Sequence, residues 1–296
     1  MSARRCFLVV PAALLVAGTS GVADAAATAP APPDPRSVLA YWTAERMVSA
    51  QPESEPARRP APSGTPTGGS VAPALPVELT AASRPYTEAG ERVHGKVFYT
   101  KNGRDTWCSA SSVTAANKSL VWTASHCVGG TTNVMYAPAY NSDGGGGAPY
   151  GRWPARKVAT SGNDHAVVVV HPLNGQSLQD VVGANGIRFN GPIDRRTTIW
   201  GYPAARVWTG RDLTYCDQPT SPSGSSTRTA CDTEGGSSGG GYITGTSTPT
   251  GLGSLWANHT AGDGGWAIGS VFGTTARNLY TANAGGPPPG GEVGAQ

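Results

Sequence analysis

Short apolar runs separated by turn residues fill the sequence between Tyr86 and Asn283. The runs are rich in β-branched and aromatic residues and are bounded by glycine, proline, asparagine and aspartate, which is the pattern of β-strands joined by turns. Eight of them are GKVFYT, SLVWTAS, NVMYAP, HAVVVVH, RTTIWGYP, GYITG, GSLWANH and WAIGSVF. Only TTARNLYTAN has a helical pattern, and it would begin at Thr274 or Thr275. Many strands without alternating helices predict an all-β fold, an antiparallel sandwich or barrel with a short C-terminal helix.

Composition agrees with this fold class and excludes one class of partner. The chain has 41 glycines and 25 prolines, and only 14% of its residues are charged, as expected for a turn-rich β protein. The net charge is +3, without a stripe of lysine and arginine. Such a sequence has no electrostatic footprint for nucleic acid, so no nucleic-acid partner is expected.

Residues 1–25 have the three regions of a secretory signal peptide. Two arginines precede an apolar run from Cys6 to Ala17, and small residues surround Asp24, so that cleavage is expected after Ala25. The apolar run is too short to span a bilayer as a helix of the mature protein. We therefore predict a secreted, extracellular protein whose mature form is not bound to a membrane.

The composition divides the rest of the chain into three parts. Residues 26–85 are rich in proline and alanine and cannot bury a core of their own. They include one amphipathic stretch, predicted as a helix near 37–50 with Ser37 as a possible N-cap. This part is either a solvated linker or the pro-segment of a zymogen that docks on the enzyme. Residues 86–284 form the predicted folded domain, and 285–296 a disordered tail. No feature requires more than a monomer.

Four cysteines remain after the signal peptide, which suits disulfides in an oxidising compartment. The competing interpretation is a metal site, but the sequence has no C-x-x-C pair and its histidines do not cluster with the cysteines, so no metal is expected. Three pairings are possible, and we choose the two local ones, Cys108–Cys127 and Cys216–Cys231. Each closes a loop short enough that chain entropy predicts roughly 3 kcal/mol of stabilisation.

Three separate motifs hold side chains capable of catalysis. VWTASHCV places His126 at the end of an apolar strand, GNDHAVVVV places Asp164 before a buried strand, and GGSSGGG places Ser237 and Ser238 among glycines. Each motif alone has an ordinary explanation: a buried core histidine, an acid that caps a strand, and a flexible loop. The glycines would also let the backbone adopt conformations that a Cβ forbids and approach a ligand closely.

Together, and in this order, the motifs resemble those of the chymotrypsin-like (trypsin-like) serine peptidases. The resemblance rests on TASHC and GSSGG, and on WCSASSV, whose cysteine corresponds to the one that bonds in this family to the cysteine after the catalytic histidine. WGYPA and LTYC, followed by CDTEGGSSGGG, are similar to the compact secreted actinobacterial members. The resemblance covers roughly Val93 to Asn283. It implies two antiparallel six-stranded β-barrels and a serine endopeptidase that acts on protein or peptide substrates.

The resemblance also implies a role for each candidate residue. Ser238 is the nucleophile, His126 the general base and then the general acid, and Asp164 the group that orients the imidazole. The backbone N–H groups of Gly236 and Ser238 form the oxyanion hole. The mechanism needs neither a metal nor an organic cofactor.

Neighbouring residues offer weaker alternatives for two of these roles. If Ser237 were the nucleophile, Gly235 would enter the oxyanion hole and Ser238 would stand where the family has glycine. His165 lies next to Asp164 but lacks the T-A-x-H-C context. Two alternative functions remain: an inactive homologue that acts as a secreted binding protein, and an esterase, although the G-x-S-x-G elbow of α/β-hydrolases is missing.

The residue preference at the cleavage site depends on two further candidates. Asp232 lies six residues before Ser238, the offset at which trypsin-like relatives carry the acid of the primary specificity pocket. This offset predicts cleavage after arginine or lysine. His259, in the strand expected to form the other pocket wall, is the rival, because related glutamate-specific enzymes use a histidine in this region to bind an acidic side chain.

Overall fold

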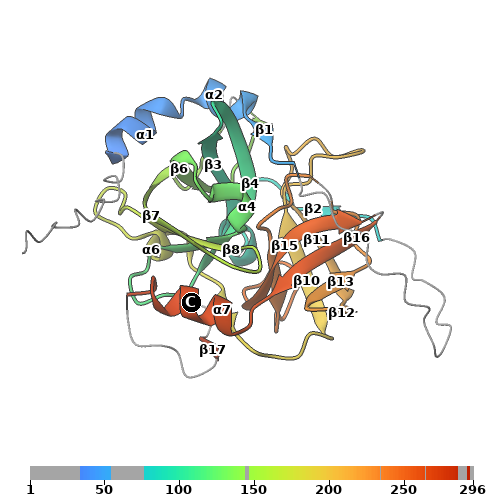
Figure 1. Cartoon of the computed structure of the whole chain (residues 1–296). Coiled ribbons are helices and arrows are strands. Elements are labelled where there is room, and N and C mark those ends of the chain that lie inside the picture. The colour runs from blue at the N-terminus through green and yellow to red at the C-terminus, as the bar shows by residue number, and fades with distance from the viewer. Residues whose placement is uncertain are drawn as a thin grey trace, which may run out of the picture. The chain divides into compact units, whose positions relative to one another are not determined.

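The first of two sheets is a closed barrel of six antiparallel strands (Figure 1). In chain order the strands are β3 (His94–Lys101), β4 (Arg104–Val113), β5 (Leu120–Thr123), β6 (Thr132–Pro138), β7 (Trp153–Ser161) and β8 (His165–Val170). They pair in the order β4-β3-β6-β7-β8-β5, and β5 pairs back to β4, which closes the ring. All of β8 is buried, as its continuous run of valines predicts.

The computed structural model describes residues 34–54, 77–143, 147–233, 235–263, 265–285 and 292–293. The predicted signal peptide lies outside them. Among the described residues, no helix is both long enough and apolar enough to cross a bilayer.

The second sheet is curled and open along its long path. Its main strands are β10 (Arg196–Gly201), β11 (Thr214–Pro219), β12 (Ser221–Ser223), β13 (Ser226–Thr229), β14 (Gly241–Thr244), β15 (Ser254–Asp263) and β16 (Trp266–Val271). The strand order is β12-β13-β16-β15-β14-β10-β11-β2, where β2 is Thr80–Ala81. No ladder between described residues joins β12 to β2. The fold is therefore the expected double-barrel type, with a second barrel that is a curled sheet rather than a closed ring.

Two further short strands extend this sheet. β9 (Gly186–Arg188) pairs in parallel with β15, and β17 (Glu292–Val293) pairs with β9. β17 lies in the predicted disordered tail, and the other residues of that tail beyond Gly285 are outside the described residues.

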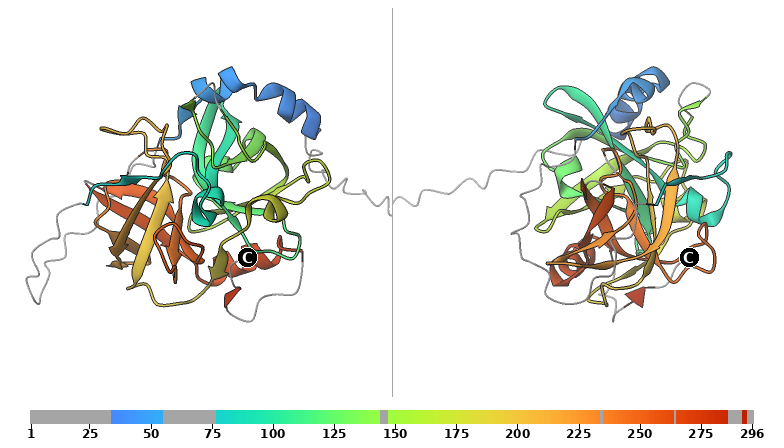
Figure 2. Two further views of the ribbon diagram at one scale, coloured as in Figure 1. Left: turned by 180° about the vertical axis from the view of Figure 1, so that it is seen from behind. Right: turned by 90° about the vertical axis from the view of Figure 1, so that its right-hand side faces the viewer.

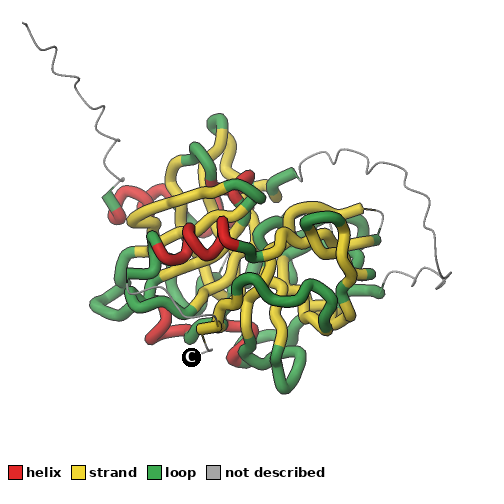
Figure 3. The backbone as a smooth tube through the Cα atoms, turned by 60° about the horizontal axis from the view of Figure 1, so that its bottom comes forward, coloured by secondary structure: helices red, strands yellow, loops and turns green. Residues whose placement is uncertain are grey.

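More helices occur within the predicted folded domain than the single one expected there. The C-terminal helix α7 (Thr274–Thr281) begins as predicted, but α3 (Ala89–Arg92), α4 (Ser125–Val128) and α6 (Leu178–Val182) are additional. Each of these three is four or five residues long, too short to produce a helical pattern in the sequence. Figure 3 shows one helix lying in front of the strands and the others around their edges. α7 follows the second sheet but returns to the first, where Tyr280 donates a hydrogen bond to Thr114 O at 2.7 Å.

The N-terminal stretch folds as two short helices, which corrects the prediction of one helix at 37–50. α1 (Pro35–Tyr41) and α2 (Ala44–Ser49) are separated at Trp42, and their N-caps are Asp34 and Thr43 rather than Ser37. The hydroxyl of Thr43 accepts from Arg46 N, so a second N-cap interrupts the helical pattern.

Residues 34–54, here named the strap, pack on the first barrel. Figure 2 shows α1 and α2 lying across one end of it. Trp42 is fully buried, with its ring centroid 5.4 Å from that of Phe98, and its indole N–H donates to Asn133 O at 2.6 Å. After α2, strand β1 (Gln51–Pro52) pairs in parallel with β4. The strap is thus held by a buried tryptophan between its two helices and by a β-ladder after the second helix.

Two disulfides brace the sheets. Cys108–Cys127 joins β4 to α4 with a Cα–Cα distance of 6.2 Å, and Cys216–Cys231 joins β11 to the segment after β13 at 6.1 Å. Both are the local pairings chosen above. The second is buried in the core of the curled sheet with Tyr242 and Trp256.

Candidate active site

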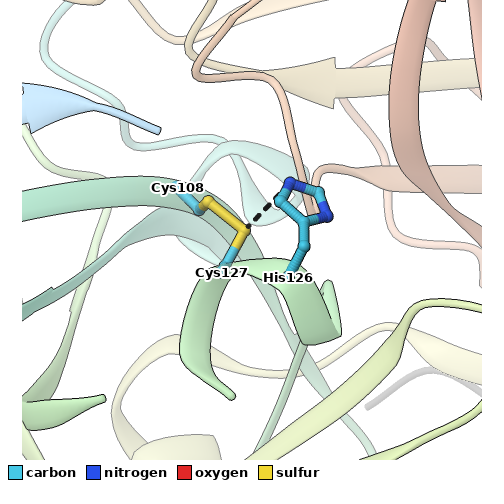
Figure 4. Close-up of side chains that lie close together, drawn as sticks. All are labelled: Cys108, His126 and Cys127. Atoms are coloured by element: carbon cyan, nitrogen blue, oxygen red, sulfur yellow. Dashed lines mark hydrogen bonds between the residues drawn. A yellow bond between two sulfur atoms is a disulfide. The ribbon is translucent and has the colours of Figure 1, made fainter. Parts of the chain in front are cut away.

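His126 is held in place by its neighbours in the chain. Strand β5 ends at Thr123, and the single helical turn α4 then carries His126 beside Cys127. The disulfide to Cys108 ties this turn to β4 (Figure 4). In addition, the Lys101 ammonium donates a hydrogen bond to His126 O at 2.6 Å. The backbone that carries the imidazole is therefore fixed on two sides.

Cys108, His126 and Cys127 lie close enough together to suggest a metal site by geometry alone. His126 Nε2 is 3.7 Å from the Cys127 sulfur (Figure 4). Zinc binds cysteine as the thiolate, and both sulfurs are here joined in a disulfide. The cluster therefore offers one imidazole and no thiolate.

Asp164 lies in a strained turn between β7 and β8. Asn163 and Asp164 both have φ of +61°, in the left-handed region. Asparagine and aspartate tolerate this region better than other side chains, but two in succession still store strain. The turn directs the Asp164 carboxylate at α4, where Oδ2 is 2.8 Å from His126 Nδ1 and Oδ1 accepts from His126 N at 2.9 Å.

Two hydroxyls complete the carboxylate's environment. Ser125 Oγ donates to Oδ1 at 3.0 Å, and Thr260 Oγ1 donates to Oδ2. Burial raises the pKa of the Asp164 carboxyl, but the hydrogen bonds and the charge of His126 outweigh it, so the pKa lies below its usual value. Asp164 is thus stabilised as a carboxylate that accepts a hydrogen bond from the imidazole.

Strand β15 supplies residues that the sequence analysis missed. Besides Thr260, Asn258 donates its amide to Asp164 O at 3.2 Å. These two flank His259 on the strand, whose register with β16 shifts between His259 and Ala261. His259 instead forms backbone hydrogen bonds with the glycine turn, accepting from Gly239 N and donating to Gly240 O, both at 2.8 Å. The run ANHTA, with three polar residues between alanines, was the available sequence signal for a strand that contacts both Asp164 and the glycine turn.

The glycines around Ser238 are required by close packing. At Gly236 the φ is +85°, and a Cβ would lie 2.6 Å from the Trp107 ring and from Tyr202 O. At Gly239 the φ is +78°, and a Cβ would collide with Thr123 and Ser109. Neither position accepts a side chain, so the run of glycines lets the turn fit between the two sheets.

The same turn leaves several backbone N–H groups free. Among the described residues, Gly236 N and Ser238 N donate no hydrogen bond, and neither do Gly235 N and Ser237 N. The carbonyls around them are occupied: Ser109 Oγ donates to Gly236 O at 2.8 Å, and Ser109 N donates to Ser238 O at 2.9 Å. A turn anchored by its carbonyls with unpaired amides is suited to bind an oxyanion.

Both adjacent serines are buried, and neither hydroxyl has a hydrogen-bond partner among the described residues. Ser237 packs against Gly201 of β10, on the side of the second sheet. The carbonyl of Ser238 accepts a hydrogen bond from the backbone N–H of Ser109, which is the residue after Cys108 on β4. Its hydroxyl does not form the expected hydrogen bond with His126 Nε2 in this structure.

His165 is separate from this arrangement. It is fully buried, with Nδ1 3.0 Å from Asn258 Oδ1 and its ring edge-on to Phe272 at 5.3 Å. It belongs to the packing between the two sheets.

The two specificity candidates have different environments. Asp232 forms an ion pair with Arg206, with Oδ2 2.6 Å from Nη1. His259 is fully buried, its ring is stacked near Tyr242 at 6.4 Å, and its Nδ1 lies 3.4 Å from Thr233 Oγ1. The carboxylate of Asp232 is therefore already neutralised by a cation, whereas the imidazole faces a hydroxyl.

Comparison with known proteins identifies the family. No family model and no curated protein matches the sequence. Among solved structures, protease Anisep from Arthrobacter nicotinovorans is 33% identical, with a TM-score of 0.61 over 68% of this chain and 99% of its own. The thermostable serine protease AL20 from an extremophilic microorganism is 32% identical, with a TM-score of 0.61 over 66% of this chain and 98% of its own.

A more distant structure extends the fold comparison. A Glu endopeptidase in complex with MPD is 16% identical, with a TM-score of 0.53 over 70% of this chain and 97% of its own. This likeness concerns the fold alone. The double-barrel fold and the two solved proteases at 33% and 32% identity establish that the chain belongs to the chymotrypsin-like serine proteases.

Proposed function

We propose that the protein is a secreted serine endopeptidase that hydrolyses peptide bonds through the triad Ser238, His126 and Asp164. The observation that carries the proposal is the hydrogen bond between His126 Nδ1 and the Asp164 carboxylate, in a site next to a glycine turn whose free amides include Gly236 N and Ser238 N. Asp164 holds the proton on Nδ1, which leaves the Nε2 lone pair available as a base.

The reaction then follows the template of this triad. Ser238 Oγ attacks the carbonyl carbon as its proton passes to His126 Nε2, and the amides of Gly236 and Ser238 stabilise the oxyanion. His126 returns the proton to the leaving amine as the C–N bond breaks, which leaves an acyl-enzyme on Ser238. Water, deprotonated by the same imidazole, then hydrolyses this ester and restores the serine hydroxyl.

Secretion is supported by the sequence of residues 1–25 and by the two disulfides, which persist in oxidising compartments. The inactive-homologue alternative is less well supported, because a histidine, an aspartate and a serine are all present and two of them are hydrogen-bonded. Labelling with a fluorophosphonate probe, followed by mapping of the modified peptide, tests the proposal. An active enzyme is labelled at Ser238 only when folded, whereas an inactive homologue is not labelled.

The rate of hydrolysis should depend on pH through a single step. Histidine changes charge between about pH 5 and 8, and His126 has to be neutral to accept the serine proton. The pKa of Asp164 lies below its usual value, so this carboxylate stays ionised throughout that range. We expect kcat/KM to rise with pH through one transition near neutrality. A rate independent of pH between about 5 and 9 would exclude an imidazole as general base.

The contacts of Asp232 and His259 favour an acidic over a basic substrate side chain. The expectation of arginine or lysine requires a carboxylate free to pair with a substrate cation, and Asp232 already pairs with Arg206. An imidazole, unlike the carboxylate of Asp232, can donate a hydrogen bond to a substrate carboxylate, and His259 lies with its Nδ1 3.4 Å from the Thr233 hydroxyl. We therefore propose glutamate as the preferred residue on the acyl side of the scissile bond.

A peptide library tests this preference. Glutamate should be favoured over arginine and lysine, and His259→Ala should lower kcat/KM for a glutamate substrate by roughly 10- to 100-fold, the effect of losing a hydrogen bond to a charged group. His171→Ala, at a partly exposed histidine directly after β8, is the matched control and should change little. A preference for arginine that disappears in Asp232→Ser would instead support the basic pocket.

A further inference from the structure

The strap ends beside the candidate catalytic histidine. Glu53 N donates to Trp107 O at 2.9 Å, continuing the pairing of β1 with β4 up to the residue before Cys108. The Glu53 carboxylate accepts from Tyr99 Oη and from Lys101 Nζ, both at 2.9 Å. That same lysine donates to His126 O at 2.6 Å, so one ammonium bridges the strap and the backbone of His126.

Glu53 also lies close to the turn that carries the nucleophile. Its carbonyl oxygen is 4.0 Å from the position that a Cβ would take on Gly235, the residue before Gly236. Trp107 connects the two elements further, because its indole N–H donates to Ala50 O at 3.1 Å while its ring packs on Gly236. The end of the strap therefore spans the interval between the His126 segment and the oxyanion turn.

Contacts at a distance from the site hold the strap down. Arg46 pairs with Asp105 at 2.8 Å and stacks over the Tyr41 ring at 3.8 Å. Arg152 donates to Leu39 O at 3.1 Å. With Trp42 fully buried, these contacts keep the end of the strap from diffusing away.

We propose that the strap is an inhibitor built into the chain, which occupies the leaving-group side of the substrate site through Pro52 and Glu53. This inference rests on the proposed function. The leaving amine has to lie next to His126, because His126 protonates it. A substrate segment beyond the scissile bond would extend from there along β4, where Glu53 already occupies the Trp107 carbonyl. Docked, the strap excludes that segment, and displaced, it leaves the edge of β4 free to pair.

The proposal is tested in the full chain with two substrates. One is a peptide with three residues beyond the scissile bond, and the other is an ester of the same acyl part with a small leaving group. Glu53→Ala removes the carboxylate bound to Lys101 and Tyr99. It should raise kcat/KM for the peptide by about tenfold, the equivalent of one charge-assisted hydrogen bond, and leave the ester rate within about twofold. Arg46→Ala loosens the strap away from the site and should act in the same direction.

Glu45→Ala is the matched control, because Glu45 is an exposed glutamate of α2 in the same strap. A ratio of peptide to ester rates that stays unchanged in both Glu53→Ala and Arg46→Ala would overturn the inference and leave the proposed function intact. An equal rise for both substrates would also overturn it, because the strap would then act on the nucleophile. If no variant hydrolysed either substrate, the proposed function itself would fail, and the inference with it.

Discussion

Ser238→Ala is expected to lower kcat for peptide hydrolysis by on the order of 10⁶-fold, because the nucleophile and its base act as a unit. The free amides of Gly236 and Ser238 remain in the variant, so a residual rate above that in water should persist. Labelling by the fluorophosphonate probe should disappear completely. Steady-state kinetics with a peptide substrate and mass spectrometry of the labelled protein measure both effects.

The change should leave the fold intact. Ser238 Oγ is buried and has no hydrogen-bond partner among the described residues, so its removal leaves no donor or acceptor unpaired. Ser237→Ala is the matched control, because Ser237 is equally buried and also has no partner for its hydroxyl in the described part of the chain. It should keep near-normal labelling and activity. Labelling that persists in Ser238→Ala and vanishes in Ser237→Ala would assign the nucleophile to the other serine.

The parts of the site that sequence analysis could predict are those fixed by short motifs. His126 follows directly from a strand that ends beside a cysteine, and the glycines around Ser238 reflect steric limits that act within a few residues, as the contacts of Gly236 and Gly239 demonstrate. The strand pattern likewise predicted eight strands of the two sheets, but the named runs did not include β4, β7, β11 or β13. In each case the signal lies in adjacent residues, because hydrophobic periodicity and turn residues are local features of the sequence.

What the sequence could not predict depends on contacts between distant segments. Thr260 and Ser125 reach Asp164 only because β15 and α4 meet at one turn. The pairing of Asp232 with Arg206 removes a free carboxylate from the predicted pocket, and no local pattern predicts this pair. The strap is the longest segment of this kind. It belongs to a proline-rich stretch that cannot form a core of its own, and it folds because Trp42 packs against Phe98 of the first barrel. Secondary-structure propensity and hydrophobic periodicity describe one segment at a time. The contacts of Asp164, of Asp232 and of the strap form between distant segments, so neither signal predicts them.

Asp164→Asn is expected to lower kcat by about 10⁴-fold while the nucleophile and base both remain. The carboxylate accepts from four donors: His126 N, His126 Nδ1, Ser125 Oγ and Thr260 Oγ1. An asparagine presents one oxygen and one amide N–H₂ in the same space. If the oxygen keeps the bonds to Ser125 and His126 N, the amide points at His126 Nδ1. The imidazole must then accept there and carry its proton on Nε2, where it cannot take the proton of Ser238.

The pH profile and a matched variant separate this tautomer effect from a general loss of structure. Thr260→Val removes one donor but keeps the carboxylate, so it should cost far less, roughly tenfold, with the same transition near neutrality. Asp180→Asn, at an exposed aspartate bound to Lys118, should have no effect on the rate. If Asp164→Asn kept more than about a tenth of the activity at neutral pH, the carboxylate would not be setting the tautomer of His126. Backbone strain at a catalytic position is explained when it directs a functional side chain. Without that role for Asp164, the positive φ angles of Asn163 and Asp164 would belong only to the local geometry of the β7–β8 hairpin.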